Sequence, residues 1–187
     1  MERLDGVRIG FAMTGSFCTF SQAFAQAERL VSLGAELVPV MSEHAAGIST
    51  RFGTAQEMRE RIEEIAGRKA ILTIEDAEPI GPKNLTDIMA VVPCTSNTAA
   101  KLAHSITDTA VTMAVKSHLR SGKPVVLAVA SNDALAGSLK NIGLLANMRH
   151  YYLVPLRRDD PVKKPASLVA DFSQTAETIL QALAAEA

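Results

Sequence analysis

The chain has no tryptophan, few other aromatic residues and only two cysteines. Aromatic side chains make up 4% of the 187 residues, which argues against a protein that stacks single-stranded nucleic acid on aromatic platforms. The formal net charge is −1, so the basic surface of a nucleic-acid-binding protein is not expected either. Two cysteines without a Cys-x-x-Cys pair or a disulfide framework indicate a reducing compartment, and we expect a cytoplasmic protein.

Long apolar runs and nucleotide fingerprints are missing as well. No apolar run approaches the roughly 20 residues that a membrane-spanning helix needs, and residues 1–6 lack the pattern of a signal peptide. Gly10 and Gly15 lie too far apart for a G-x-G-x-x-G motif, and no Gly-Lys-Ser/Thr of a P-loop follows them. The first glycine-containing turn is therefore neither a dinucleotide fingerprint nor a P-loop, and we predict no metal site.

Apolar residues, by contrast, make up 48% of the chain, and we expect residues 1–187 to form one domain. The hydrophobic pattern predicts strands at 7–13, 36–40, 88–92, 124–129 and 151–155, and a third strand or extended piece at 70–74. It predicts helices at 21–33, 54–66, 133–147 and 173–185, with loops at 43–53, 75–85 and 157–165. A further helical region runs from the end of the fourth strand to 120, with Asp108 as the candidate cap of a second helix within it. Buried strands that alternate with helices are typical of a Rossmann-like three-layer α/β/α fold, here with a six-stranded parallel sheet.

Polar residues gather where three of the predicted strands end. Thr14-Gly15-Ser16 follows the first strand, Thr95-Ser96-Asn97-Thr98 the fourth, and Ser131-Asn132-Asp133 the fifth. In a 3-2-1-4-5-6 strand order these turns converge on one crevice at the carboxyl edge of the sheet. Helix N-termini and hydroxyl groups favour a small anionic ligand there. Taken singly, each turn is equally well explained as an ordinary helix cap.

Several nearby side chains have two interpretations. Lys101 lies one helical turn beyond Asn97, and the Asn97 amide either faces the crevice or simply caps the helix. Cys18 and Cys94 lie just beyond strand ends, but no histidine is close in sequence, so buried, inert thiols are the simpler interpretation. His104 is interpreted as a packed or capping residue rather than a catalytic base.

The combination of Thr14-Gly15-Ser16 with Pro93-x-x-x-Asn97-Thr98-x-x-Lys101 resembles the flavoprotein family of homo-oligomeric, flavin-containing cysteine decarboxylases. Residues 130–143, 151–155 and 159–165 resemble, within that family, the B subunits of dipicolinate synthases. The resemblance implies a bound FMN. Its phosphate would lie on Gly15 and Ser16 with help from Ser42, and Thr95, Asn97 and Thr98 would line the flavin or phosphate pocket. The remaining candidate cofactor residues are Thr14, Ser96, Ala130, Ser131 and Asn132.

The resemblance also implies a function. It implies an oxidoreductase subunit in the mother cell of a spore former. Together with the dehydrogenase-like A subunit of dipicolinate synthase, which carries NAD(P), the chain would oxidise a dihydrodipicolinate-type precursor to the dicarboxylate dipicolinate. An FMN-binding flavoprotein of the cysteine decarboxylase type and a non-catalytic partner subunit remain as alternatives.

Two departures from the decarboxylase pattern put decarboxylation in doubt. Decarboxylase members carry a histidine between the third and fourth strands, but residues 75–92 contain none, and the four histidines of the chain lie elsewhere. Only Asn132 is left of their Pro-x-Met-Asn-x-x-Met-Trp motif. We therefore assign no decarboxylation and name no catalytic residue. A homo-oligomer is expected, with the apolar stretch Ala110–Val115 packed on a neighbouring copy.

Overall fold

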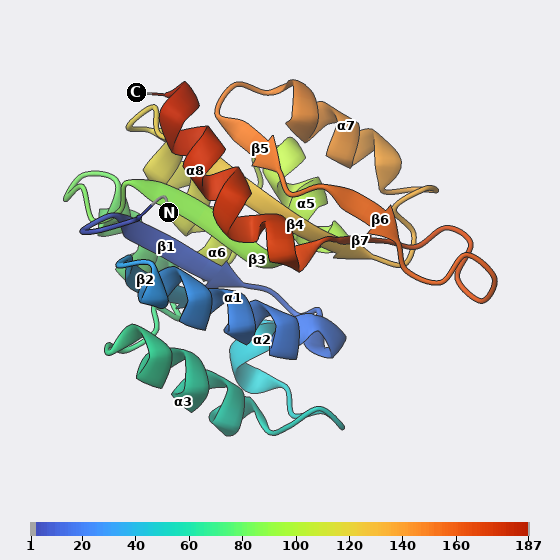
Figure 1. Cartoon of the computed structure of the whole chain (residues 1–187), viewed down its shortest axis with the longest axis horizontal. Helices are drawn as coiled ribbons and strands as arrows, with labels where there is room; N and C mark the ends of the chain where they lie inside the picture. Colours follow the sequence, from blue (N-terminus) through green and yellow to red (C-terminus); the bar gives the residue numbers. More distant parts are fainter. Residues whose placement is uncertain (1–2, 187) are drawn as a thin grey trace.

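The computed structural model describes residues 3–186 as helices packed on both faces of a central sheet (Figure 1). The strands are β1 (Arg8–Met13), β2 (Glu36–Met41), β3 (Ile88–Thr95), β4 (Val125–Ser131), β5 (Tyr151–Leu153), β6 (Leu156–Arg158) and β7 (Leu168–Ala170). Their order is β2-β1-β3-β4-β7-β6, and β5 pairs with β4 beside this path. The predicted three-layer α/β fold is confirmed.

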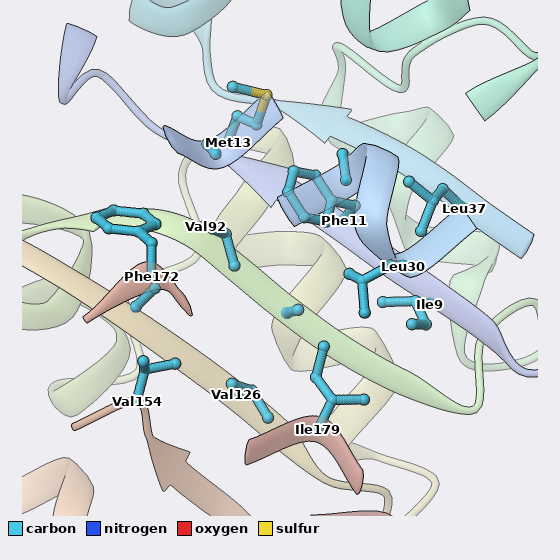
Figure 2. Close-up of a cluster of buried hydrophobic side chains, with 14 of the residues drawn as sticks. Ile9, Phe11, Met13, Leu30, Leu37, Val92, Val126, Val154, Phe172 and Ile179 are labelled. Carbon is cyan, nitrogen blue, oxygen red and sulfur yellow. The ribbon is translucent and has the colours of Figure 1, made fainter. Parts of the chain in front are cut away.

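Eight α-helices and three short 3₁₀ helices connect the strands within residues 3–186. They are α1 (Phe20–Ser32), α2 (Glu43–Gly47), α3 (Ala55–Ala66), α4 (Ile74–Ala77), α5 (Ser96–Ala103), α6 (Ala110–Leu119), α7 (Leu139–Asn147) and α8 (Thr175–Ala185), with η1 (Phe17–Thr19), η2 (Glu78–Ile80) and η3 (Phe172–Gln174). Side chains of α1, α3 and α8 pack on one face of the sheet, and those of α4 to α7 pack on the other. Figure 2 shows the first of these clusters, in which Phe11 and Leu30 join the strands to α1.

The third strand or extended piece predicted at 70–74 is an extended piece, and it lies in the predicted position. Ile71 forms only an isolated parallel bridge with Val40, in which the Ile71 N–H donates to the Pro39 carbonyl at 2.9 Å. Thr73 then caps α4 by accepting from the Asp76 N–H at 3.1 Å, so the chain turns into a helix where a loop was predicted. The predicted order 3-2-1-4-5-6 therefore holds among the parallel elements.

The sheet is not wholly parallel, which corrects a second prediction. The first half of β4 pairs with β5 in parallel, whereas Ala130 and Ser131 at its end pair antiparallel with β7. β6 and β7 form a hairpin, and most of the predicted loop 157–165 lies between its two strands. At the hairpin tip, the Asp160 carboxylate accepts from the backbone N–H groups of Val162 and Lys163. The sheet thus has seven strands within the described residues.

Helix boundaries were predicted well where a cap is encoded locally. Thr54 and Glu57 form the expected capping box of α3. The helical region predicted up to 120 contains two helices, as expected, because the backbone turns at Ser105, whose φ is 57°. Thr109, not Asp108, caps α6 by accepting from the Thr112 N–H at 3.1 Å.

Two further helix predictions need correction. The predicted loop 43–53 contains the short helix α2, capped by Ser42. The predicted helix from 133 begins only at Leu139, after a run of turns. Among the helices of residues 3–186, none has the length and apolar character needed to cross a bilayer.

The stretch Ala110–Val115 does not form an apolar outer surface. Ala110, Val111, Ala114 and Val115 are at most 3% exposed, because α6 packs into the second core of its own chain. The structural reason given for self-association was therefore wrong. Large apolar side chains are exposed instead on α7, where Leu139 is 48% and Leu144 is 45% exposed.

Candidate functional site

A hydrogen-bonded junction joins the turn after β1 to the turn after β3. The Thr14 hydroxyl donates to the Pro93 carbonyl at 2.8 Å and accepts from the Thr95 N–H at 2.9 Å. Thr14 is 1% exposed, so water does not compete for these bonds. The junction coincides with an irregularity of β3, whose register against β4 shifts between Val91 and Cys94. The two turns are thereby held side by side at the carboxyl edge.

A cavity of about 400 Å³ opens beside this junction. It is lined by Thr14, Gly15, Phe17, Ser42, Glu43, His44, Ile48, Thr95, Asn97, Thr98, Lys101, Asp108 and Thr109. This volume lies within the range of small-molecule and cofactor sites. The lining comes from the ends of β1, β2 and β3 and from the segment before α6, which is where parallel α/β sheets bind ligands.

The structure brings six of the eleven predicted cofactor residues to this cavity and leaves five outside its lining. Those that line it are Thr14, Gly15, Ser42, Thr95, Asn97 and Thr98. Those that do not are Ser16, Ser96, Ala130, Ser131 and Asn132. The first two predicted turns therefore converge with the end of β2, whereas the turn after β4 does not reach this cavity.

The turn after β4 binds its own polar groups. The Asp133 carboxylate accepts from the Ser131 hydroxyl at 2.6 Å and from the Ser138 hydroxyl at 2.8 Å. These two bonds, with a smaller contribution from Ser96, hold the pKa of Asp133 below its usual value. Ser131 also pairs with β7 through Leu168. Ser131 and Asp133 thus help to fix the chain between β4 and α7.

Hydrogen-bond donors dominate the wall near β2 and α5. The Ser42 hydroxyl accepts from the Ala45 N–H at 3.3 Å, which leaves its own O–H able to donate. Thr95 caps α5 by accepting from the Thr98 N–H at 3.2 Å. The backbone N–H groups of Ser96 and Asn97 have no acceptor within the helix, because they belong to its first turn. Asn97 is thus a residue of the first turn and not the cap.

Charged side chains of both signs complete the lining. Lys101 donates to both carboxylate oxygens of Asp108, at 2.7 and 2.9 Å, and this pairing lowers the pKa of Asp108. Glu43 and His44 begin α2 and also line the cavity. The sequence did not single out His44 as a site residue, and the structure places it in the lining. The sequence did contain a signal for His44. Ser42 caps a helix directly after β2, so Glu43 and His44 follow at the same carboxyl edge of the sheet.

Neither cysteine lines the cavity. Cys94 is fully buried, and burial raises the pKa of its thiol to about 12, so it is not a thiolate near neutral pH. Cys18 is exposed, which corrects the expectation of a buried thiol. Within residues 3–186, no cluster of three or more histidine, cysteine or acidic side chains has the geometry of a metal site.

The family model described as "Flavoprotein" matches residues 1–182. The chain belongs to the flavoprotein family. Among curated members it is 43% identical to the B subunit of dipicolinate synthase from Bacillus subtilis (strain 168), over 98% of this chain and 92% of that protein. It is 31% identical to the flavin prenyltransferase UbiX of Archaeoglobus fulgidus, over 77% of this chain and 82% of that one. The flavoprotein family thus includes proteins that are named as enzymes.

Solved structures of the family agree with the fold. The crystal structure of the dipicolinate synthase B subunit from Bacillus halodurans matches with a TM-score of 0.89 and 38% identity, over 97% of this chain and 93% of that chain. AnUbiX in complex with FMN and dimethylallyl pyrophosphate matches with a TM-score of 0.70 and 19% identity, over 96% and 93%. At that identity, the second match supports the fold alone.

Proposed function

We propose that this chain is the B subunit of a dipicolinate synthase and acts in the cytoplasm of a spore-forming mother cell. Together with the dehydrogenase-like A subunit, it oxidises a dihydrodipicolinate-type precursor to pyridine-2,6-dicarboxylate. The reaction removes one hydride, which NAD(P) on the partner accepts, and one proton. The proposal is supported above all by 43% identity to a B subunit over 98% of the chain. We propose that residues 1–187 act as one domain in this complex.

The cavity is proposed to hold FMN, and its chemistry fits that group. Hydroxyls of Ser42 and Thr98 and the N–H groups at the start of α5 suit phosphate or ring-edge oxygens. Phe17 and Ile48 supply apolar wall for a flavin ring. When bound, FMN supplies the capacity to take up or release a hydride equivalent.

The chain's own residues bind and orient the ligand in this proposal. Thr14 fixes the spacing between the two donor-bearing turns, because its buried hydroxyl contacts both Pro93 and Thr95. His44 lines the cavity, where its imidazole nitrogens can contact polar groups of a ligand.

A non-catalytic partner subunit is the second candidate. The observation that favours it is the exposed apolar surface of α7, formed by Leu139 and Leu144, which offers a contact for another chain. In this alternative the cavity is not used in the reaction.

Reconstitution with the dehydrogenase-like partner separates the two candidates. We would measure dipicolinate formation by that partner with NADP⁺ and the precursor, alone, with the wild-type chain, and with the Asn97→Asp variant. The proposal expects a rate that requires the wild-type chain and falls at least tenfold with the variant, while the complex still forms in gel filtration. An equal rate with wild type and variant would favour the non-catalytic partner. A full rate with the dehydrogenase-like partner by itself would contradict both. Flavin absorbance of the chain after incubation with FMN and desalting tests the cofactor separately.

A further inference from the structure

Lys101 is the one lysine or arginine among the described residues that line the cavity. The other formally charged residues of the lining, Glu43 and Asp108, are acidic. The formal charges of Lys101, Glu43 and Asp108 sum to −1. The acidic side chains of the lining therefore repel a ligand with two negative charges, unless the Lys101 ammonium turns toward that ligand.

The two partners of the Lys101–Asp108 pair differ in their access to water. The Lys101 side chain is 22% exposed, whereas that of Asp108 is 57% exposed. Leaving the half-buried ammonium without a partner costs more than leaving the exposed carboxylate, which water can solvate again. The pair therefore breaks at low cost only when another acidic group replaces Asp108.

The segment that carries Asp108 lies between α5 and α6, and its backbone is hydrogen-bonded to that of Lys101. The Ile106 N–H donates to the Lys101 carbonyl at 2.8 Å, and Thr109 caps α6 immediately afterwards. Asp108 itself has neither role in the backbone. Its carboxylate contacts the ammonium and otherwise faces solvent. This arrangement fits a carboxylate that neutralises a binding lysine until a ligand arrives.

We propose that Asp108 stands in for the acidic group of the ligand, and that a ligand carboxylate or phosphate displaces it from Lys101. The inference rests on the proposed function, since it takes the cavity to be the ligand site. The acidic group has two possible sources, the phosphate of FMN and a carboxylate of dipicolinate. Lys101 is then a specificity-determining residue, and Asp108 lowers the affinity for anions.

Calorimetric titrations of the full-length chain test this inference. The ligands are FMN, riboflavin without its phosphate, dipicolinate and pyridine without its carboxylates. The variants are Lys101→Gln and Asp108→Asn, with Lys140→Gln as the matched control because Lys140 is exposed on α7 outside the lining. We expect about tenfold weaker binding of the acidic ligand with Lys101→Gln and about threefold to tenfold tighter binding with Asp108→Asn. The control should change neither affinity.

The result for Asp108→Asn decides the question. Tighter binding of FMN but not riboflavin assigns the phosphate to Lys101, and tighter binding of dipicolinate alone assigns a carboxylate. If Asp108 only holds Lys101 in position, Asp108→Asn weakens binding as Lys101→Gln does, and the inference is wrong while the proposed function stands. If the wild-type chain binds neither FMN nor dipicolinate at millimolar concentration, the proposed function fails and the inference with it. Thermal melting of each variant confirms that it is folded.

Discussion

The hydroxyl of Thr14 lies 2.9 Å from the backbone nitrogen of Thr95, a residue 81 positions later in the chain. The same hydroxyl donates to the Pro93 carbonyl at 2.8 Å. One buried side chain thus sets the distance between the first and second turns of the candidate site. The donors of both turns face one cavity because this contact holds them together.

Replacing Thr14 with valine should destabilise the protein and weaken ligand binding together. Valine keeps the shape but leaves the Thr95 N–H without its acceptor, which costs about 1–3 kcal/mol of unfolding free energy. Urea denaturation gives the stability, and FMN titration gives the affinity. Thr14→Ser keeps the hydroxyl and is the control. Equal stability of Thr14→Val and wild type would show that the contact does not hold the two turns.

Asn97 tests whether the first turn of α5 binds an anion. Because Thr95 is the cap, Asn97→Ala should change the unfolding free energy little. Asn97→Asp places a negative charge in the first helical turn, which stabilises a helix by about 0.3–1 kcal/mol but repels an anionic ligand. We therefore expect an unchanged or slightly higher melting temperature with weaker FMN or dipicolinate binding. Binding by Asn97→Asp as tight as wild type would contradict the assignment of this turn.

His118 should make stability depend on pH. The imidazole is 1% exposed, with Nδ1 at 2.8 Å from the Thr86 hydroxyl and Nε2 at 3.0 Å from the Pro124 carbonyl. Burial lowers its pKa from 6.5 to about 4. The unfolded chain therefore binds the proton first, and the stabilisation present above pH 6.5 is lost as the pH falls toward 4. The loss amounts to about 3 kcal/mol.

The measurement for His118 is the unfolding free energy at several pH values between 7 and 4. His118→Gln removes the titrating group, so its stability at pH 7 should be lower but its decline across this window shallower. Other groups titrate in both proteins and cancel in the difference. Parallel pH curves for the two proteins would show that His118 is not the cause.

Self-association should involve the exposed apolar side chains of α7 rather than α6. Light scattering at micromolar concentration is expected to give a mass above the 19.9 kDa of one chain. Replacing Leu139 and Leu144 together with glutamate should reduce that mass, since both side chains are nearly half exposed. Val162→Glu, at a position 89% exposed on the hairpin tip, is the control. A wild-type mass of 19.9 kDa would contradict the prediction of a homo-oligomer.

The sequence by itself determined the layered α/β fold and the first part of the site. Buried apolar runs such as Ile88–Val92 indicate strands because they fit only a sheet covered on both faces. Thr54 with Glu57 marked a helix start because capping is a contact over three residues. Thr14 and Thr95 were placed in one site from strand order alone, and the structure confirms that they meet.

Only the tertiary structure decided which polar turns face the cavity. Ser131 and Asn132 resemble the other turns in composition, yet Asp133 and Ser138 bind the first of them internally. Ile71 looked like part of a strand or an extended piece, and the end of β2 offers it only one bridge before Thr73 starts a helix. The approach of His44 and Asp108 to the same cavity depends on where α2 and the segment before α6 pack. Such contacts join residues far apart in the chain, and no local pattern encodes them.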